Sequence, residues 1–330
     1  MSTPKFSVHL IGTGSYLPER VLTNADLEKM VETSDEWITS RTGIKERHVA
    51  RVDEASSDMA AEAARRAMAD AGVQPQQIEL IVVATATPDM FFPSTACFVQ
   101  KALRIPEATS FDVSAACSGF VYALDVARAM LESGRYTRAL VIGAEKLSSI
   151  TNWKDRGTCV LFGDGAGAAV LERREGPGGI LSSYVMADAE QTDILNVPGG
   201  GSRMPPTSDV IANAKNTIHM QGKEVFKLAV HRMISAAQKA LALAGKQESD
   251  LALLIPHQAN LRIIEAIAER VAMPRERIFV NLQKYGNMSA ATTIVALDEA
   301  RRAGRVKKGD LVELVAFGAG LTWGAAVIQF

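Results

Sequence analysis

Cys117 is the side chain in this sequence best placed to act as a nucleophile. It follows a short apolar strand predicted at 110–113 and a run of small residues, and it precedes a helix that Gly134 ends. At a helix start, unpaired N–H groups and the positive end of the helix dipole favour an anion, so we expect a thiol pKa below the usual value. Most free cysteines, however, are small buried hydrophobes. The position of Cys117 alone leaves both interpretations open.

His257 and Asn287 extend this pattern into the second half of the chain. His257 follows an apolar strand and precedes a helix, and Asn287 follows Gly286 at a strand-to-helix junction that corresponds to the one at Cys117. Each also has an ordinary structural explanation, as a hydrogen-bonded core histidine and as a turn or helix-cap residue. Because open α/β sheets place ligands at the ends of their strands, the three residues together favour a single site.

A glycine-rich stretch near the end of the chain, Phe317-Gly318-Ala319-Gly320, could supply a backbone N–H group to such a site. Glycines at alternate positions permit close backbone approach, so an N–H here could face a developing oxyanion. Neither this stretch nor the glycines at 163–167 open a long helix, as a dinucleotide fingerprint requires. The glycines at 163–167 are explained equally well by close packing of two parts of the chain.

The bulk composition indicates an ordinary globular protein with a sizeable core. The chain has 330 residues, of which 47% are hydrophobic and 22% charged, which suits about two domains. A net charge of −1 does not favour binding to nucleic acid or to an anionic membrane. Three unclustered cysteines argue against a disulfide framework or a zinc site, so we expect a reducing, cytoplasmic setting. We also expect no signal peptide and no transmembrane segment.

The second half of the chain repeats the strand and helix order of the first. The helix-ending glycines Gly72 and Gly245 lie 173 residues apart (245 − 72), and each is followed by an apolar strand. A strand predicted at 278–281 and a helix at 289–303 take the places of strand 110–113 and the cysteine helix. Such a duplication predicts an α/β fold of two similar halves whose sheets are covered on both faces.

We place the boundary between the two halves after residue 178, giving an N-terminal half at 1–178 and a C-terminal half at 179–330. The first half opens with a strand at 6–11 and a predicted turn at 12–15. The stretch 188–220 reads as a long irregular loop, and such loops are often functional. If a pseudo-twofold axis relates the halves, the junctions of Cys117 and Asn287 converge.

Over nearly its whole length the chain resembles the β-ketoacyl-[acyl-carrier-protein] synthase III family of the thiolase-like superfamily. The matching segments are Ile11-Gly12-Thr13-Gly14-Ser15-Tyr16-Leu17-Pro18, Ser34-Asp35-Glu36-Trp37-Ile38, Arg41-Thr42-Gly43-Ile44, Ala115-Ala116-Cys117-Ser118-Gly119-Phe120, Phe162-Gly163-Asp164-Gly165-Ala166-Gly167-Ala168, Pro256-His257-Gln258-Ala259-Asn260 and Gly286-Asn287. The resemblance implies a duplicated five-layer αβαβα fold and a homodimer. It implies condensation of a primer acyl-CoA, typically acetyl-CoA, with malonyl-[acyl-carrier protein], initiating fatty-acid synthesis. No metal or cofactor is implied.

The resemblance also implies roles for individual residues. Cys117 would carry the acyl group as a thioester, and His257 and Asn287 would bind the malonyl thioester carbonyl and stabilise the enolate formed by decarboxylation. The backbone N–H groups of Cys117 and Ala319 would form a second oxyanion hole. Ala319 stands where the family often has glycine, which is tolerable because only its N–H is needed.

Further residues match positions that bind the substrates in the family. Trp37 and Arg156 match the pair that holds the adenine of CoA. Phe92 matches a residue that bounds the acyl pocket, although packing in a dimer core would explain it as well. Lys223 departs from the family, where asparagine is common. The other matches are four at the entrance and pantetheine channel, Thr33, Arg41, Gly222 and Asn260, and two at the basic patch that docks the acidic carrier protein, Lys227 and Arg262.

Two other functions remain open at this point. The chain could be a condensing enzyme of the same fold that uses longer acyl groups in secondary metabolism. It could also be a non-catalytic scaffold that binds acyl-CoA or carrier protein, although the three intact site residues speak against this. A thiolase is disfavoured because no cysteine lies near 318–324, and an elongating synthase because Asn287 stands where the second histidine would be.

Overall fold

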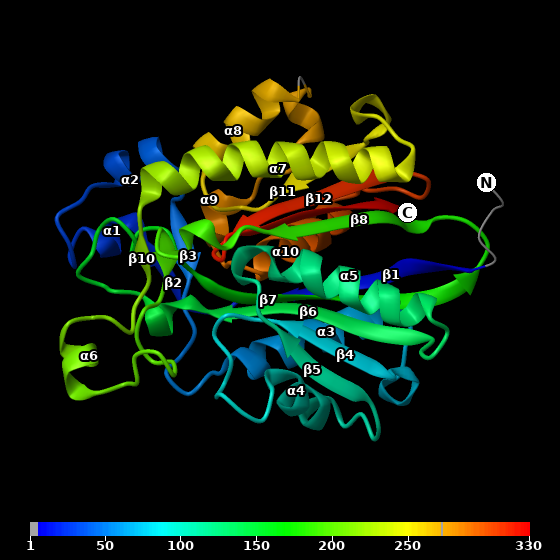
Figure 1. Cartoon of the computed structure of the whole chain (residues 1–330), viewed down its shortest axis with the longest axis horizontal. Coiled ribbons are helices and arrows are strands. Elements are labelled where there is room, and N and C mark those ends of the chain that lie inside the picture. The colour runs from blue at the N-terminus through cyan, green and yellow to red at the C-terminus, as the bar shows by residue number, and fades with distance from the viewer. Residues whose placement is uncertain (1–5, 272) are drawn as a thin grey trace.

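Two β-sheets form the centre of the computed structural model, which describes residues 6–271 and 273–330 (Figure 1). The first sheet has the order β1-β7-β6-β4-β5 and the second the order β11-β12-β13-β8. The strands of these sheets are β1 (Phe6–Tyr16), β4 (Leu80–Ala84), β5 (Thr109–Val113), β6 (Arg138–Lys146), β7 (Asp164–Glu175), β8 (Gly179–Ala187), β11 (Leu253–Pro256), β12 (Leu311–Gly318) and β13 (Thr322–Gln329). Two short ribbons accompany them, formed by β2 (Val21–Thr23) with β3 (Glu46–His48) and by β9 (Leu195–Asn196) with β10 (His219–Met220).

The helices form three layers around the two sheets. They are α1 (Asn24–Leu27), α2 (Asp35–Thr42), α3 (Ser56–Ala71), α4 (Thr95–Leu103), α5 (Gly119–Glu132), α6 (Ser208–Ala212), α7 (Gly222–Ala244), α8 (Leu261–Arg270), α9 (Leu282–Tyr285) and α10 (Ala291–Arg302). Helices α3 and α4 pack on the first sheet, α7 packs on the second and on α8, and α5 and α10 each contact both sheets. The predicted five-layer αβαβα fold is therefore confirmed.

The two sheets have matching strand directions. In the first, β4 and β6 are parallel, and β7 and β1 follow as antiparallel neighbours. In the second, β11 and β12 are parallel, and β13 and β8 follow in the same way. The boundary after residue 178 stays a prediction, because α5 and α10 share one apolar core between the sheets.

The strand predicted at 278–281 does not form. Only a single parallel bridge, between Leu254 and Ile278, stands where β5 pairs with β4 in the first half. The backbone N–H of Asn281 donates to the side chain of Gln258 at 2.9 Å, and α9 begins at the next residue. The side chain of Gln258 thus accepts the backbone hydrogen bond that would otherwise have continued the pairing of this segment with β11.

The predicted turn at 12–15 is also wrong, because β1 continues through it and pairs with β7 beyond a register shift between Leu10 and Gly12. A Cβ atom at Gly12 would lie 2.6 Å from the carbonyl oxygen of Ala67 in α3. Glycine is therefore needed here for the close approach of a helix, and not for a turn.

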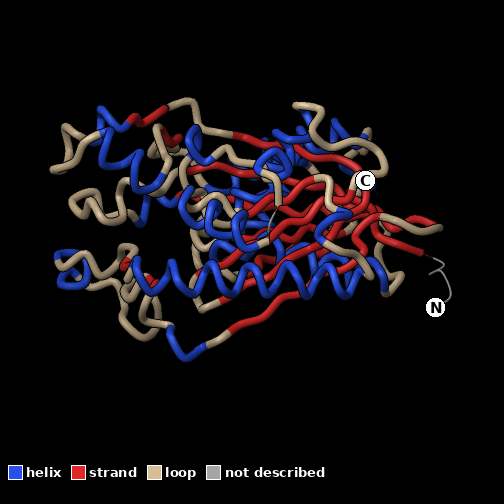
Figure 2. The backbone as a smooth tube through the Cα atoms, turned by 90° about the horizontal axis from the view of Figure 1, so that it is seen from above, coloured by secondary structure: helices blue, strands red, loops and turns tan. Residues whose placement is uncertain are grey.

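The start of β1 and the C-terminal end of the chain lie at one end of the molecule (Figures 1 and 2). The short elements α1, α2, α6, β2, β3 and β10 lie at the other end (Figure 1). The expected irregular loop at 188–220 belongs to this second end, and it contains β9, α6 and β10. In the part of the chain that the structure describes, none of the helices is long and apolar enough to cross a membrane.

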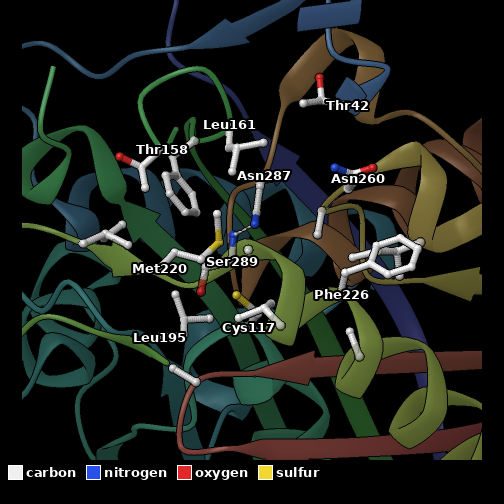
Figure 3. A pocket seen from close by; sticks show the side chains of 18 of the residues that line it. Thr42, Cys117, Thr158, Leu161, Leu195, Met220, Phe226, Asn260, Asn287 and Ser289 are labelled. Atoms are coloured by element: carbon white, nitrogen blue, oxygen red, sulfur yellow. Dashed lines mark hydrogen bonds between the residues drawn. The ribbon is translucent and has the colours of Figure 1, made fainter. Parts of the chain in front are cut away.

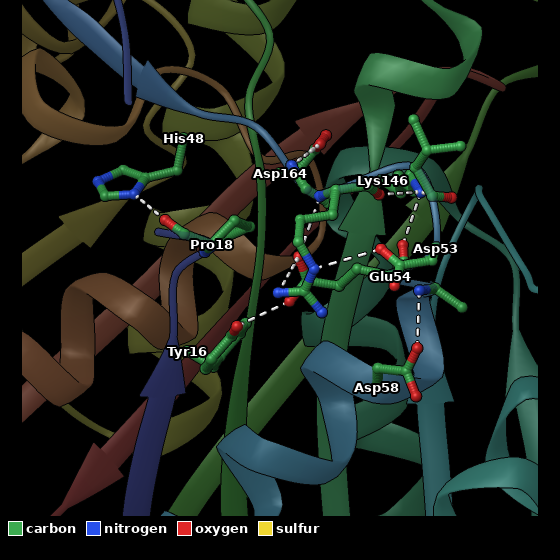
Figure 4. A network of polar contacts seen from close by, with 12 residues as sticks. Tyr16, Pro18, His48, Asp53, Glu54, Asp58, Lys146 and Asp164 are labelled. Carbon is green, nitrogen blue, oxygen red and sulfur yellow. Dashed lines mark hydrogen bonds and ion pairs between the residues drawn. The ribbon is translucent and has the colours of Figure 1, made fainter. Parts of the chain in front are cut away.

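A polar network fixes the ends of β6 and β7 (Figure 4). Buried Asp164, at the start of β7, accepts hydrogen bonds from the backbone N–H groups of Ala50 and Ser148, both at 2.8 Å. Lys146, at the end of β6, donates to the carbonyl oxygen of Glu54 at 2.6 Å. These contacts hold one corner of the first sheet, next to the candidate site described below.

Glu313 is a buried acid in β12 that works against stability. It is 1% exposed, and its Oε1 is among the few buried polar atoms of the described residues that lack a hydrogen-bond partner. Burial holds its pKa well above the usual 4.5, and Glu248 raises it further. The folded state therefore keeps a proton on Glu313 that the unfolded chain releases above pH 4.5, so this residue lowers stability as the pH rises.

Replacing Glu313 by glutamine should therefore stabilise the protein in a pH-dependent way. Relative to the parent protein, we expect Glu313→Gln to gain up to about 1.4 kcal/mol for each pH unit above 4.5, until the pKa of the folded state is reached. Melting temperatures measured from pH 4 to pH 9 would show this as a widening difference. Exposed Glu107 provides the matched control, Glu107→Gln. A difference that stays constant over this range would contradict the account.

Candidate active site

A cavity of about 1070 Å³ brings together four of the positions singled out in the sequence (Figure 3). Its lining includes Cys117 before α5, His257 after β11, Asn287 after α9 and Ala319 after β12. The four come from both halves of the chain. The expected convergence of strand ends from the two halves is therefore present in the structure.

A strained turn positions Cys117. It lies in a single 3-10 turn, Ala116–Ser118, and Ala116 before it has a φ of 45°, which non-glycine residues rarely adopt. The end of β12 packs directly against this turn, because a Cβ atom at Gly318 would lie only 2.6 Å from the backbone nitrogen of Cys117. A hydrogen bond of 2.7 Å between the hydroxyls of Ser118 and Thr322 also joins the turn to the start of β13.

The junction that carries Asn287 has the same form. Ser289 also has a φ of 45°, and it stands 173 residues after Ala116 (289 − 116). The backbone N–H of Ser289 donates to Oδ1 of Asn287 at 2.8 Å. Since this contact requires the carbonyl oxygen of the amide, the NH₂ group of Asn287 is left to face the cavity. A bridge between Phe162 and Asn287 fixes the backbone against the first half.

His257 is held by both backbone and side-chain contacts. Its backbone N–H donates to the carbonyl oxygen of Val315 at 2.8 Å, and its Nδ1 lies 2.6 Å from Oγ1 of Thr292. The residue is 4% exposed, and burial lowers the pKa of the imidazole to about 3. The ring is therefore neutral at physiological pH.

The expectation of a lowered thiol pKa at Cys117 is wrong. Burial raises the pKa of Cys117 to about 12, and a hydrogen bond with Ser289 offsets only part of this shift. The nearby carboxyl group of Glu145 adds to the rise. Helix α5 begins two residues later, at Gly119, so desolvation outweighs the effect of the helix start. The Cys117 side chain is therefore a protonated thiol at neutral pH.

Sequence reasoning missed three polar residues beside the site. Glu145, at the end of β6, is fully buried and accepts hydrogen bonds from Thr87 Oγ1 at 2.7 Å and from the Ala86 N–H at 3.0 Å. Burial raises its pKa to about 7. A charged residue at the end of an apolar strand is a signal that could have indicated it. Ser289 and Thr292 carry no such signal, because they lie among the buried residues around the start of α10.

Six of the other predicted binding residues line the cavity, whereas Thr33, Arg156 and Phe92 do not. Trp37 has the guanidinium carbons of Arg41 and Arg156 at 4.8 and 5.1 Å from its ring centre. The lining includes Trp37, Arg41, Gly222, Lys223, Lys227, Asn260 and Arg262. Thr33 and Arg156 lie outside it, although Arg156 stays beside Trp37 and donates to the carbonyl oxygen of Glu32 at 2.8 Å.

Phe92 does not line the cavity of its own chain. Its side chain is 83% exposed, and it stands beside exposed Phe91 and Met90. These three residues form an apolar patch on the surface.

In the described ranges, 6–271 and 273–330, no group of three or more His, Cys, Asp or Glu side chains is arranged to hold a metal ion.

Comparisons with known proteins identify one family over most of the chain. Models of 3-oxoacyl-[acyl-carrier-protein] synthase III and of its C-terminal part match residues 111–189 and 241–330. A β-ketoacyl-[acyl-carrier-protein] synthase III from Caldanaerobacter subterraneus is 55% identical, with 99% of this chain and 98% of the relative covered.

Two solved structures have the same fold over nearly their full length. The 3-oxoacyl-[acyl-carrier-protein] synthase III of Aquifex aeolicus has a TM-score of 0.91 at 48% identity, covering 98% of this chain and 100% of that one. A priming β-ketosynthase from the R1128 polyketide pathway has a TM-score of 0.91 at 34% identity, covering 100% and 98%. The chain therefore belongs to the β-ketoacyl-[acyl-carrier-protein] synthase III family, the condensing enzymes that initiate fatty-acid synthesis.

Proposed function

We propose that this chain condenses a primer acyl-CoA with malonyl-[acyl-carrier protein] through an acyl-Cys117 intermediate, releasing CoA, CO₂ and β-ketoacyl-[acyl-carrier protein]. The observation that carries the proposal is the shared cavity, where a thiol, a neutral imidazole and a carboxamide NH₂ group line one space. The reaction needs these three groups and no metal or cofactor. Each supplies one function, either nucleophilic attack or donation to an oxyanion.

In the first half-reaction, the sulfur of Cys117 attacks the carbonyl carbon of the acyl-CoA. The N–H groups of Cys117 and Ala319 donate to the oxyanion of the tetrahedral intermediate, since Gly318 lets their backbones lie close together. The carbon–sulfur bond to CoA then breaks. The proton that Cys117 loses ends on the sulfur of free CoA. Because burial raises the pKa of Cys117 to about 12, the thiolate forms only as the bound thioester reacts.

In the second half-reaction, His257 and Asn287 donate hydrogen bonds to the thioester carbonyl oxygen of the malonyl group. The bond to the carboxylate breaks, CO₂ leaves, and the electron pair forms an enolate whose oxygen both residues stabilise. The enolate carbon attacks the acyl-Cys117 carbonyl, and the Cys117 sulfur leaves as a thiolate that takes a proton from water to restore the resting thiol. A neutral histidine suits this role, because it donates without being a strong acid, and burial keeps it neutral.

The cavity entrance suits an adenine nucleotide and an acidic protein. The Trp37 ring, with Arg41 and Arg156 beside it, offers stacking and cation–π contact to the adenine. Thr33, Gly222 and Asn260 match the remaining CoA contacts of the family. Lys227 and Arg262 stand on α7 and α8 at the entrance, where a carrier protein would dock.

A homodimer would explain the exposed patch around Phe92. Phe91 and Phe92 are both 83% exposed, and a second copy of the chain would bury them. In that arrangement Phe92 would bound the acyl pocket of the partner instead of its own.

A longer acyl primer is the second candidate. The likeness to the R1128 priming β-ketosynthase, which belongs to a polyketide pathway, favours a role in secondary metabolism, and the apolar side chains of Leu195, Met220 and Met233 in the cavity lining suit a longer acyl chain. The fold and the chemistry would be unchanged, and only the acyl group would differ.

The primer can be identified by mass spectrometry of the Cys117 peptide. Incubation with a panel of acyl-CoAs of two to twelve carbons should add an acyl mass to this peptide alone, most rapidly from acetyl-CoA. Cys97 and Cys159 serve as internal controls. Fastest labelling by a medium or long chain would support the second candidate, and absence of acyl-Cys117 from every donor would refute the proposal.

Substitution of Asn287 should slow the second half-reaction and spare the first. Since its NH₂ group serves only the enolate, Asn287→Ala should lower malonyl decarboxylation about 100-fold or more while acylation of Cys117 continues at nearly the parent rate. Release of CO₂ and the mass of the Cys117 peptide measure the two steps independently. Equal loss of both steps would contradict the roles assigned here.

Reversing the charge at Lys227 should weaken use of the carrier protein. We expect Lys227→Glu to raise the KM for malonyl-[acyl-carrier protein] about five- to tenfold and to leave acylation by acyl-CoA unchanged. Exposed Lys239 lies on the same helix, about 18 Å further along, so Lys239→Glu is a control with an identical charge change. If acylation by acyl-CoA fell equally, Lys227 would serve CoA and not the carrier protein.

A further inference from the structure

The role of His257 depends on which of its ring nitrogens carries the proton. A neutral imidazole has a single N–H group, so only one nitrogen can donate. Nδ1 contacts Thr292, which leaves the opposite nitrogen, Nε2, for the cavity that His257 lines. Donation to a substrate carbonyl therefore requires the proton on Nε2 and a bare Nδ1.

Thr292 is the residue that can select between the two tautomers. Its hydroxyl has one proton and two acceptors within reach, Nδ1 of His257 at 2.6 Å and the carbonyl oxygen of Ser289 at 3.0 Å. If the proton goes to Ser289, Thr292 accepts from Nδ1–H, and Nε2 presents a lone pair to the cavity. If it goes to His257, Nε2 presents an N–H group.

We propose that Thr292 is a positioning residue whose hydroxyl donates to Nδ1 of His257 and so holds the tautomer with Nε2–H facing the cavity. The 2.6 Å contact to Nδ1 exists in both arrangements, and in the proposed one the carbonyl oxygen of Ser289 keeps the backbone N–H of Thr292, at 3.3 Å, as its donor. The inference rests on the proposed function, because the donor role of His257 chooses between the two arrangements.

One short segment then orients both donors, His257 and Asn287, of the oxyanion site proposed for the malonyl thioester. The N–H of Ser289 holds Oδ1 of Asn287 and turns the NH₂ group of that amide toward the cavity. Three residues later, the hydroxyl of Thr292 sets the proton of His257 in the same way. The start of α10 thereby directs two N–H donors, from two other elements, to one oxygen.

The kinetic test compares three variants. Thr292→Val keeps the shape and removes the hydroxyl, and we expect malonyl decarboxylation to fall at least about tenfold while acylation of Cys117 stays near the parent rate. Thr292→Ser restores the hydroxyl and should recover most of the lost rate. The matched control is Thr293→Val, since Thr293 is 1% exposed and its hydroxyl is one of those in the described residues without a hydrogen-bond partner.

Nitrogen NMR of histidine-labelled protein reads the tautomer directly, with the His257 signals assigned by their loss in His257→Gln. A protonated Nε2 and an unprotonated Nδ1 in the parent protein, with a mixture in Thr292→Val, would support the proposal. A protonated Nδ1 in the parent protein would overturn it, as would unchanged decarboxylation in Thr292→Val or equal loss of both half-reactions. If the parent protein fails to decarboxylate malonyl-[acyl-carrier protein], the proposed function fails, while the tautomer remains measurable.

Discussion

The close approach between Gly318 and the turn of Cys117 is the constraint on which the site depends. A side chain at position 318 would begin 2.6 Å from the backbone nitrogen of Cys117 and 3.0 Å from that of Ser118. Only glycine therefore lets the end of β12, in the second sheet, lie against the start of α5. The hydrogen bond between the hydroxyls of Ser118 and Thr322 adds a second contact between the turn of Cys117 and the second sheet. The neighbouring N–H groups of Cys117 and Ala319 are brought into one cavity by this packing, and a substrate carbonyl can be bound between the two halves.

Burial gives the site its second property, which is the absence of charge on its reacting groups. The same desolvation that raises the pKa of Cys117 to about 12 lowers that of His257 to about 3. Because the thiolate and not the thiol is the nucleophile, the proposed reaction requires Cys117 to lose its proton as the bound thioester reacts. A neutral imidazole, in turn, could donate a hydrogen bond to the enolate oxygen of the proposed reaction without transferring a proton to it. The pKa of Glu145 is itself raised to about 7, and when this carboxyl group is ionised its charge raises the pKa of Cys117 further.

The duplicated α/β pattern predicted that Cys117, His257 and Asn287 would meet, because strand ends in such a chain share an edge, whereas the order of the layers and the place of Ala319 were implied by the resemblance to the family. Sequence reasoning failed where tertiary packing overrides a local pattern. The glycines of β1 predicted a turn, but they are needed because α3 packs closely against this strand. After Ile278 no strand forms, because the backbone N–H of Asn281 donates to the side chain of Gln258 and not to a neighbouring strand. The prediction of a lowered pKa for the Cys117 thiol was wrong for a similar reason, since the position of a residue at a helix start does not show how deeply the fold buries it. The place of Phe92 outside its own cavity depends on the folded surface, which no short motif encodes.

The central claim is that one cavity provides two separate oxyanion sites, one for the acyl group and one for the malonyl group. A crystal structure of the protein acylated at Cys117 tests it most directly. The account predicts the thioester carbonyl oxygen within hydrogen-bond distance of the N–H groups of Cys117 and Ala319, with the donors of His257 and Asn287 converging on a different point beside the acyl carbon. An acyl carbonyl bound instead by His257 and Asn287, or an acyl group turned away from Ala319, would contradict it.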